Sequence, residues 1–194
     1  MNPSSEIIRC FAALYPDASA LEEIAEVIGL LREAYPSVRW EHPQHVHVTA
    51  RFMGDTERAA ALRISRAITE RLHGTDEVKT DINMLGAFPN TRKPRLVWLG
   101  FRHPQPHLLR IQKRVEEICV AQGLEAERTA FTPHLTIGRV KTSGGNNDLH
   151  GVLQSCSFNP ISVTFGDVRV MQSTLTPAGA IHREIGRTEL LFHS

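Results

Sequence analysis

Cysteine, aromatic side chains and long apolar runs are all scarce in this 194-residue sequence, in which Phe, Trp and Tyr make up 6%. The three cysteines, Cys10, Cys119 and Cys156, contain no Cys-x-x-Cys pair, which argues against a disulfide framework and a thiolate zinc site. No apolar run approaches the roughly 20 residues of a membrane-spanning helix. The start, MNPSSEIIRC, lacks the basic and apolar regions of a secretory signal. We therefore expect a cytoplasmic protein with reduced thiols and no membrane attachment.

Excess charge is also missing. The formal net charge is +1, from 22 basic and 21 acidic side chains, which argues against general polyanion binding but leaves local basic patches open. A content of 41% hydrophobic and 22% charged residues is that of an ordinary globular protein. A chain of this length can bury a substantial core, as one domain or as two small lobes.

What the sequence does contain is His-x-Thr twice, at His47-Val48-Thr49 and at His134-Leu135-Thr136. Side chains alternate between the two faces of a β-strand, so each histidine shares a face with its threonine. Strict alternation in the first run places two sets of side chains on opposite faces, a polar set of His45, His47, Thr49 and Arg51 and an apolar set of Val46, Val48, Ala50 and Phe52. The copies lie nearly half a chain apart, and a duplicated α+β unit would place their strands side by side.

The remaining pattern predicts strands and helices in mixed order. Strands are expected at 7–14, 38–40, 45–52, 79–88, 95–101, 161–165 and 167–175, around the second motif and near Leu190. Apolar residues at helical spacing predict helices across 21–31, 61–72 and 108–119, and a shorter one at 148–155. Ser19 is available to cap the first helix, which Pro36 should stop. The composition of 141–147 predicts a mobile loop and that of 177–179 a turn.

Two histidines facing one another across a site can carry out concerted acid–base chemistry, because imidazole titrates near neutral pH. One takes a proton from attacking water while the other gives a proton to the departing oxygen. A threonine hydroxyl on the same face can donate a hydrogen bond to an oxygen that gains negative charge. This set suits in-line displacement at a phosphodiester without a metal, and a five-membered cyclic phosphate fits well because its leaving group stays tethered.

The two motifs and their surroundings resemble the two-histidine (2H) phosphoesterase superfamily, and within it the LigT-like branch of RNA 2′,3′-cyclic phosphodiesterases. The resemblance runs nearly end to end. It rests on HVTARFMG and PHLTIGR for the two signatures, and on the flanking segments RCFAAL, LGAFPNTRKPRLVWLG and DVRVMQSTLTPAGA. One His-x-Thr alone would be weak evidence, whereas two copies with flanking segments in order are specific.

The resemblance implies an α+β fold in which residues 1–194 form a single domain of two pseudo-symmetric lobes. Each lobe would be an antiparallel sheet backed by helices, with the site in a central cleft. The implied reaction opens an RNA 2′,3′-cyclic phosphate to a 2′-phosphate, and the reverse step would join RNA ends through a 2′-5′ linkage. No metal or cofactor is implied, the partner is RNA with a cyclic end or a related nucleotide, and we expect a monomer.

The family also suggests a role for each site residue. His47 corresponds to the general acid and His134 to the general base, while Thr49 and Thr136 would hold phosphate oxygens. Arg139 is similar to an arginine that contacts the phosphate. Strict alternation, however, turns Arg139 away from His134, unless Gly138 supplies a bulge or strand end.

Less specific interpretations stay open. His45 and His47 have the spacing of a metal pair that His42 or His134 could complete. The same site could act on a small cyclic nucleotide or a 2′-5′ linked oligonucleotide, or the fold could bind RNA ends without turnover. Two further sets could contact RNA or serve the fold alone: the basic Arg92, Lys93 and Arg95, and the aromatic Trp40, Phe52 and Trp98, of which Phe52 and Trp98 are expected to pack in the core.

Overall fold

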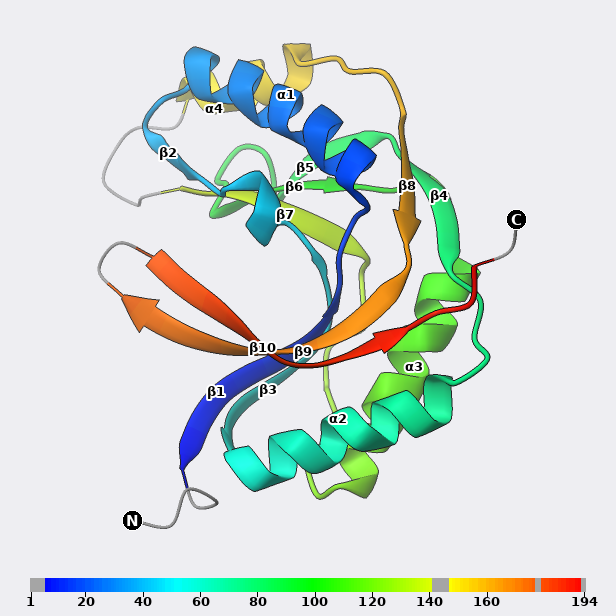
Figure 1. Ribbon diagram of the computed structural model, residues 1–194. Helices are drawn as coiled ribbons and strands as arrows, with labels where there is room; N and C mark the ends of the chain where they lie inside the picture. Colours follow the sequence, from blue (N-terminus) through cyan, green and yellow to red (C-terminus); the bar gives the residue numbers. More distant parts are fainter. Residues whose placement is uncertain (1–5, 141–146, 177–178, 193–194) are drawn as a thin grey trace.

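The computed structural model describes residues 6–140, 147–176 and 179–192 and has an α+β fold (Figure 1). Within these residues the helices are α1 (Ala18–Ala34), α2 (Arg58–Leu72), α3 (Pro106–Ala121) and α4 (Asn147–Ser155), with a short 3-10 turn, η2 (Pro43–His45). The strands are β1 (Ile7–Leu14), β2 (Val38–Trp40), β3 (Val48–Glu57), β4 (Val78–Ile82), β5 (Met84–Phe88), β6 (Leu96–Gly100), β7 (His134–Val140), β8 (Ile161–Phe165), β9 (Asp167–Thr176) and β10 (Gly179–Glu189).

The main sheet consists of two strand groups that meet at one residue pair. The first group has the order β10-β9-β1-β3 and the second β7-β6-β5, with β2 also pairing β7. The groups join where Val48 of β3 pairs with Leu135 of β7, and all of these pairings are antiparallel. β4 and β8 form a separate two-stranded sheet. The expected α+β fold with antiparallel sheets is confirmed, and the two motif strands are neighbours as a duplicated unit requires.

The helices cover the two strand groups separately. α2 and α3 pack on each other and on strands β3 and β10 of the first group, whereas α1 packs on β8, η2 and β2 (Figure 1). Each helix buries one stripe, for example Ile24, Ile28 and Leu31 in α1, all at most 1% exposed. No helix in the described ranges has both the length and the apolar character that crossing a membrane would take.

Most of the predicted elements form, with four differences. The strand predicted at 45–52 is β3, which begins at Val48 and runs to Glu57, so His47 directly precedes it. Asp17, not Ser19, caps α1: its carboxylate accepts hydrogen bonds from the backbone N–H of Ala20 and of Thr164, 3.1 Å and 2.6 Å away. The predicted strand 79–88 is two strands, β4 and β5, which part at Asn83 to join different sheets. Of the predicted loop and turn, residues 141–146 and 177–178 lie outside the described residues; Asn147 already belongs to α4, whose prediction is confirmed.

Candidate functional site

An irregularity in β3 sets the direction of the first motif's side chains. Along the β1–β3 ladder, Thr49 pairs with Ala13 and Arg51 pairs with Ala12, which leaves Ala50 without a partner. An extra residue of this kind is a β-bulge, and it reverses the alternation of side chains beyond it.

β7 has the same bulge at the same position. Thr136 pairs with Trp98 of β6 and Gly138 pairs with Val97, so Ile137 is the extra residue. From histidine to the fifth residue beyond it, both copies show one sequence of exposure: part-exposed, buried, part-exposed, buried, buried, exposed. The duplication therefore extends to the backbone irregularity, which the two sequences do not reveal.

Four predicted site residues lie on one face, which we call the motif face: His47, Thr49, His134 and Thr136. Val48 and Leu135 between them are fully buried and pair with each other, so their neighbours point to the opposite side. Because Val48 and Leu135 pair with each other, the residues that flank them, His47 and Thr49 in one copy and His134 and Thr136 in the other, meet at this junction of the two strand groups.

Both imidazoles are held by the same hydrogen bond. Nδ1 of His47 lies 2.6 Å from the carbonyl oxygen of His45, and Nδ1 of His134 lies 2.8 Å from the carbonyl oxygen of Thr132. A carbonyl oxygen only accepts, so Nδ1–H is the donor in each case. Nε2 is then the ring nitrogen that remains to exchange a proton with a ligand.

His47 is surrounded by other rings. Phe11 stacks on it with centroids 4.9 Å apart, Tyr15 lies at 5.2 Å, and His182 of β10 lies edge-on at 5.8 Å. Burial lowers the pKa of His47 to about 4, partly opposed by the His45 carbonyl and reinforced by the charges of His182, His45 and Arg139. His47 is therefore neutral at pH 7 in the free protein, while part of its side chain stays accessible.

His134 rests on a different support. Phe88 of β5 meets its ring edge-to-face with centroids 5.0 Å apart, and Trp98 backs Phe88 at 5.3 Å. Trp98 packs over glycines, because a Cβ at Gly86 or Gly100 would lie 2.3 Å or 2.8 Å from its ring. Trp98, expected in the core, is instead part-exposed between the fully buried Val97 and Leu99 and pairs with Thr136, so it lies on the motif face. The glycines of β5 and β6 make the space for its ring.

Arg139 lies on the motif face after all. It pairs with Leu96 beyond the bulge at Ile137, and the bulge turns it to the side of His134. Its Nε donates to Glu41 at 3.0 Å, with the side chain 58% exposed. Arg139 is also one of the charges that lower the pKa of His47, so its positive field reaches the first motif.

The same geometry overturns the predicted positions of Arg51 and Phe52. Arg51, expected on the motif face, is 7% exposed and points to the core, where its Nε meets Glu116 at 3.0 Å. Its Nη1 pairs with the carboxylate of Glu127, and its Nη2 donates to the backbone carbonyl oxygen of Glu125. Phe52, expected in the core, is 61% exposed and lies beside Phe11 with ring centroids 6.0 Å apart. The cause is the bulge at Ala50, which exchanges the faces of both residues.

Three residues at the site were not found by sequence reasoning: Phe11, Tyr15 and His182. Phe11 and Tyr15 belong to a small buried cluster on the motif side of β1. The unbroken apolar run from 11 to 15 is typical of a strand buried on both faces and could have indicated it. His182 comes from the distant strand β10, and no local pattern marks it. Its buried Nδ1 has no hydrogen-bond partner within the described residues.

Two of the open interpretations can be compared with this geometry. His45 lies in η2 and His47 directly precedes β3, so the two do not share a strand face. No group of three or more metal-binding side chains occurs in the described ranges. Arg92 and Lys93 are exposed in a turn whose backbone N–H groups donate to Asn90. Trp40 donates its indole N–H to the Tyr35 carbonyl at 3.0 Å.

Comparison with known proteins identifies a family and relatives for this chain. A family model described as the 2′-5′ RNA ligase superfamily matches residues 16–176. A protein named RNA 2′,3′-cyclic phosphodiesterase from Methanothermobacter thermautotrophicus is 30% identical over 181 residues, covering 92% of this chain and 96% of that protein. One of the same name from Aquifex aeolicus is 27% identical over 183 residues, covering 91% and 94%.

Solved structures show the same fold. LigT from E. coli in its apo form superposes with a TM-score of 0.73 at 18% identity, covering 96% of this chain and 99% of that one. Its complex with 3′-AMP gives 0.74 at 18% identity, covering 95% and 99%. The family match and the relative at 30% identity both span most of the sequence. The chain belongs to the 2′-5′ RNA ligase superfamily.

Proposed function

We propose that this protein hydrolyses the 2′,3′-cyclic phosphate at the end of an RNA chain to a 2′-phosphate. The observation that carries the proposal is the pair of histidines on the motif face. Each is oriented by a carbonyl two residues earlier, and each directly precedes one member of the Val48–Leu135 pair that joins the two motif strands. The names of the relatives and the 3′-AMP complex of LigT support a substrate with a phosphate on the terminal ribose.

In the proposed step a water oxygen attacks phosphorus in line with the 3′ oxygen. His134 takes the proton from water through Nε2 as the new P–O bond forms. The P–O3′ bond breaks, and His47 gives a proton to O3′, which leaves as a hydroxyl while phosphate stays on O2′. One proton enters His134 and one leaves His47, so the next turnover requires proton exchange with solvent.

To act as the acid, His47 must carry a proton on Nε2 before the P–O3′ bond breaks. Its pKa of about 4 in the free protein leaves it neutral at pH 7, which is the form of a base. A phosphate anion beside the ring favours the charged imidazolium and raises the pKa. We therefore propose that substrate binding loads the proton that His47 later donates.

The remaining motif residues bind the charge that develops on phosphorus oxygens. Thr49 and Thr136 offer hydroxyl donors from the two sides of the site. Arg139 offers a guanidinium on the same face and would exchange its exposed contact with Glu41 for the phosphate. Because an exposed ion pair is weak, this exchange costs little.

The test is to incubate the protein and a metal chelator with a short RNA that ends in a 2′,3′-cyclic phosphate, and to identify the product by phosphorus NMR. Wild type should give a 2′-phosphate. His47→Ala and His134→Ala should each lower the rate by about 10²- to 10⁴-fold, the usual contribution of a general acid or base. His103→Ala, which removes an exposed histidine elsewhere, is the matched control.

An unchanged cyclic end with wild-type protein would overturn the proposed reaction. A 3′-phosphate product would retain the two-histidine site but reverse the leaving group. If wild type opened a small cyclic nucleotide and left the RNA intact, the substrate would be the alternative one acting at the same site.

A further inference from the structure

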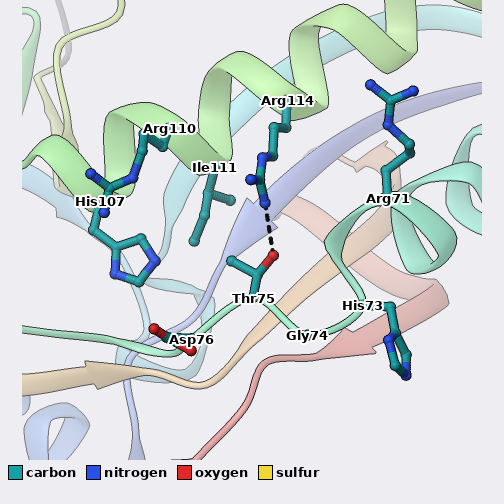
Figure 2. Close-up of a pocket in the computed structure, with 9 residues that line it drawn as sticks. All are labelled: Arg71, His73, Gly74, Thr75, Asp76, His107, Arg110, Ile111 and Arg114. Atoms are coloured by element: carbon teal, nitrogen blue, oxygen red, sulfur yellow. Dashed lines mark hydrogen bonds between the residues drawn. The ribbon is translucent and has the colours of Figure 1, made fainter.

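A cavity of about 380 Å³ lies away from the motif face, beside the helices that cover the first strand group. It is formed by the end of α2, the connection to β4 and the first half of α3 (Figure 2). Neither motif contributes to it. Its polar lining consists of Arg71, His73, Thr75, Asp76, His107, Arg110 and Arg114, and the side chain of Ile111 lies among them.

Helical spacing gathers the basic residues of α3 at this cavity. His107, Arg110 and Arg114 follow one another three and four residues apart, so they share one face of the helix. The apolar stripe of α3 is buried, which leaves this basic face to the surface. Two arginines four residues apart repel each other, an arrangement that a bound anion would stabilise.

Within the described part of the chain, basic side chains outnumber carboxylates at this cavity. None of the three arginines takes part in the ion pairs found among the described residues. Arg114 donates from Nη1 to the hydroxyl of Thr75, a neutral group, at 2.9 Å. Asp76 is the one carboxylate in the lining, so three guanidinium groups and one carboxylate leave a formal charge of +2.

Figure 2 shows how these groups lie. Arg114 reaches down to Thr75, His107 and Arg110 stand beside it above Asp76, and Arg71 extends away at the opposite rim. His107 reports the positive field: burial lowers its pKa, Arg110 and then Arg114 lower it further, and Asp76 opposes them.

We propose that this cavity binds a phosphate group, at a site separate from the two histidines. Guanidinium groups present paired N–H donors that match phosphate oxygens, and Arg114 uses one of its five donors on Thr75. The cavity, of about 380 Å³, has room for more than one phosphate group. The phosphate could belong to the backbone of RNA or to a free phosphate-bearing molecule. The binding does not require the hydrolysis proposed above.

The test compares two double variants with equal loss of charge. Arg110→Gln with Arg114→Gln removes the cations at the cavity, and both positions are exposed, so the fold should be kept. Arg63→Gln with Arg66→Gln removes two exposed cations from α2 outside the cavity lining and is the control. The probes are pyrophosphate and a short RNA with hydroxyl ends, titrated at low ionic strength while the ring protons of His107 are followed by NMR.

The cavity variant should bind at least one probe tenfold more weakly than wild type, while the control binds as wild type does. Loss of pyrophosphate binding identifies a free phosphate ligand. Loss of RNA binding alone, with a salt dependence reduced by about 0.7 in slope for each phosphate contact removed, identifies the RNA backbone. Equal affinities for the two double variants, or binding that leaves the His107 signals unmoved, would overturn the proposal. So would binding of an acidic peptide with no response to either probe.

Because the RNA probe has no cyclic end, its binding reports on this cavity without turnover. Failure here would leave the two-histidine reaction untouched, and failure of that reaction would leave this test valid.

Discussion

The two copies of His-x-Thr share a backbone but differ in what surrounds it. Each has a bulge one residue after the threonine and a histidine tied to the carbonyl two residues before it. Four residues after the histidine, the first copy has a buried arginine, Arg51, and the second has Gly138. Five residues after it, the first exposes the aromatic Phe52 and the second the cation Arg139.

This difference shows how a duplicated unit becomes an asymmetric site. Because both copies have the bulge, the fourth residue after the histidine points inward in each copy and the fifth points outward in each copy. The inward residues serve packing, whereas the outward residues, Phe52 and Arg139, are exposed beside the proposed site. The first copy supplies a ring-lined, weakly basic histidine, and the second supplies positive charge. The proposed substrate is asymmetric too, because its terminal nucleotide carries a nucleobase at one end and the cyclic phosphate at the other.

The largest effect is expected at the inward position of the first copy. Arg51→Ala leaves Glu116, only 19% exposed, without its cation. Removing one partner of a buried pair is strongly destabilising, and because Glu127 is half-exposed and can turn to water, we expect a loss of about 3 kcal/mol. Urea denaturation measures it. Glu184→Ala removes only the exposed pair with Arg187, which keeps its contact with Asp167, and should cost less than about 1 kcal/mol. Equal losses in the two variants would contradict this account.

The next effect comes from the ring-lined histidine. The pKa of His47 is about 4 in the folded protein and near 6.5 when unfolded, so below pH 6.5 the unfolded chain binds a proton that the folded chain does not. Stability contributed by the neutral ring is therefore complete above pH 6.5 and is lost as the pH falls towards 4. Between pH 7 and 4.5, wild type should lose about 2 kcal/mol more than His47→Gln. His103→Gln should keep the wild-type dependence, and parallel curves for all three would refute the assigned pKa.

A smaller effect is expected at the inward position of the second copy. A Cβ at Gly138 would lie 2.8 Å from Cε3 of Trp40 and 2.9 Å from Cγ1 of Val38. Gly138→Ala should therefore overpack this region and cost about 1–2 kcal/mol of unfolding free energy. Gly29→Ala, inside α1 with nothing within 4 Å, should instead stabilise by about 0.5–1 kcal/mol. The same sign for both substitutions would show that packing does not explain Gly138.

Much of the secondary structure was predictable from the sequence, because the spacing of apolar residues in a segment decides which side of a strand or helix is buried. Alternation placed each histidine with its threonine, and helical spacing found the buried stripes of α1, α2 and α3. Strict alternation failed beyond Ala50, because the residue composition of β3 does not indicate the extra residue of the bulge. The error in the faces of Arg51 and Phe52 follows from that one position.

The rest of the site depends on contacts between distant segments. Glu116 and Glu127, which hold Arg51, follow it by more than sixty residues, and His182 reaches His47 from β10. No window of sequence contains both members of such a contact. Arg139 shows the opposite case, since its predicted role conflicted with alternation until the bulge at Ile137 resolved the conflict.

The outward cation of the second copy can be tested separately from its ion pair. Arg139→Ala should lower kcat/KM for an RNA 2′,3′-cyclic phosphate about tenfold, as expected for one charge-assisted contact to phosphate. Stability should change by less than about 1 kcal/mol, because the pair with Glu41 is exposed. Glu41→Gln keeps the cation and should not lower kcat/KM. If both variants lost activity equally, the ion pair and not the phosphate contact would be what matters.

The smallest effect tests why the two histidines differ. His182 lowers the pKa of His47 through its charge, whereas burial is the larger cause. His182→Phe keeps a ring in contact with Phe11 and His47 but removes the charge, so the pKa of His47 should rise while the ring stays buried. An NMR titration of the His47 ring proton measures this directly, with His103→Phe as the control. A pKa that stays fixed would show that His182 contributes nothing to the shift of His47. A rise accompanied by a matching shift in the acidic limb of kcat/KM would show that β10 sets the proton affinity of the first copy.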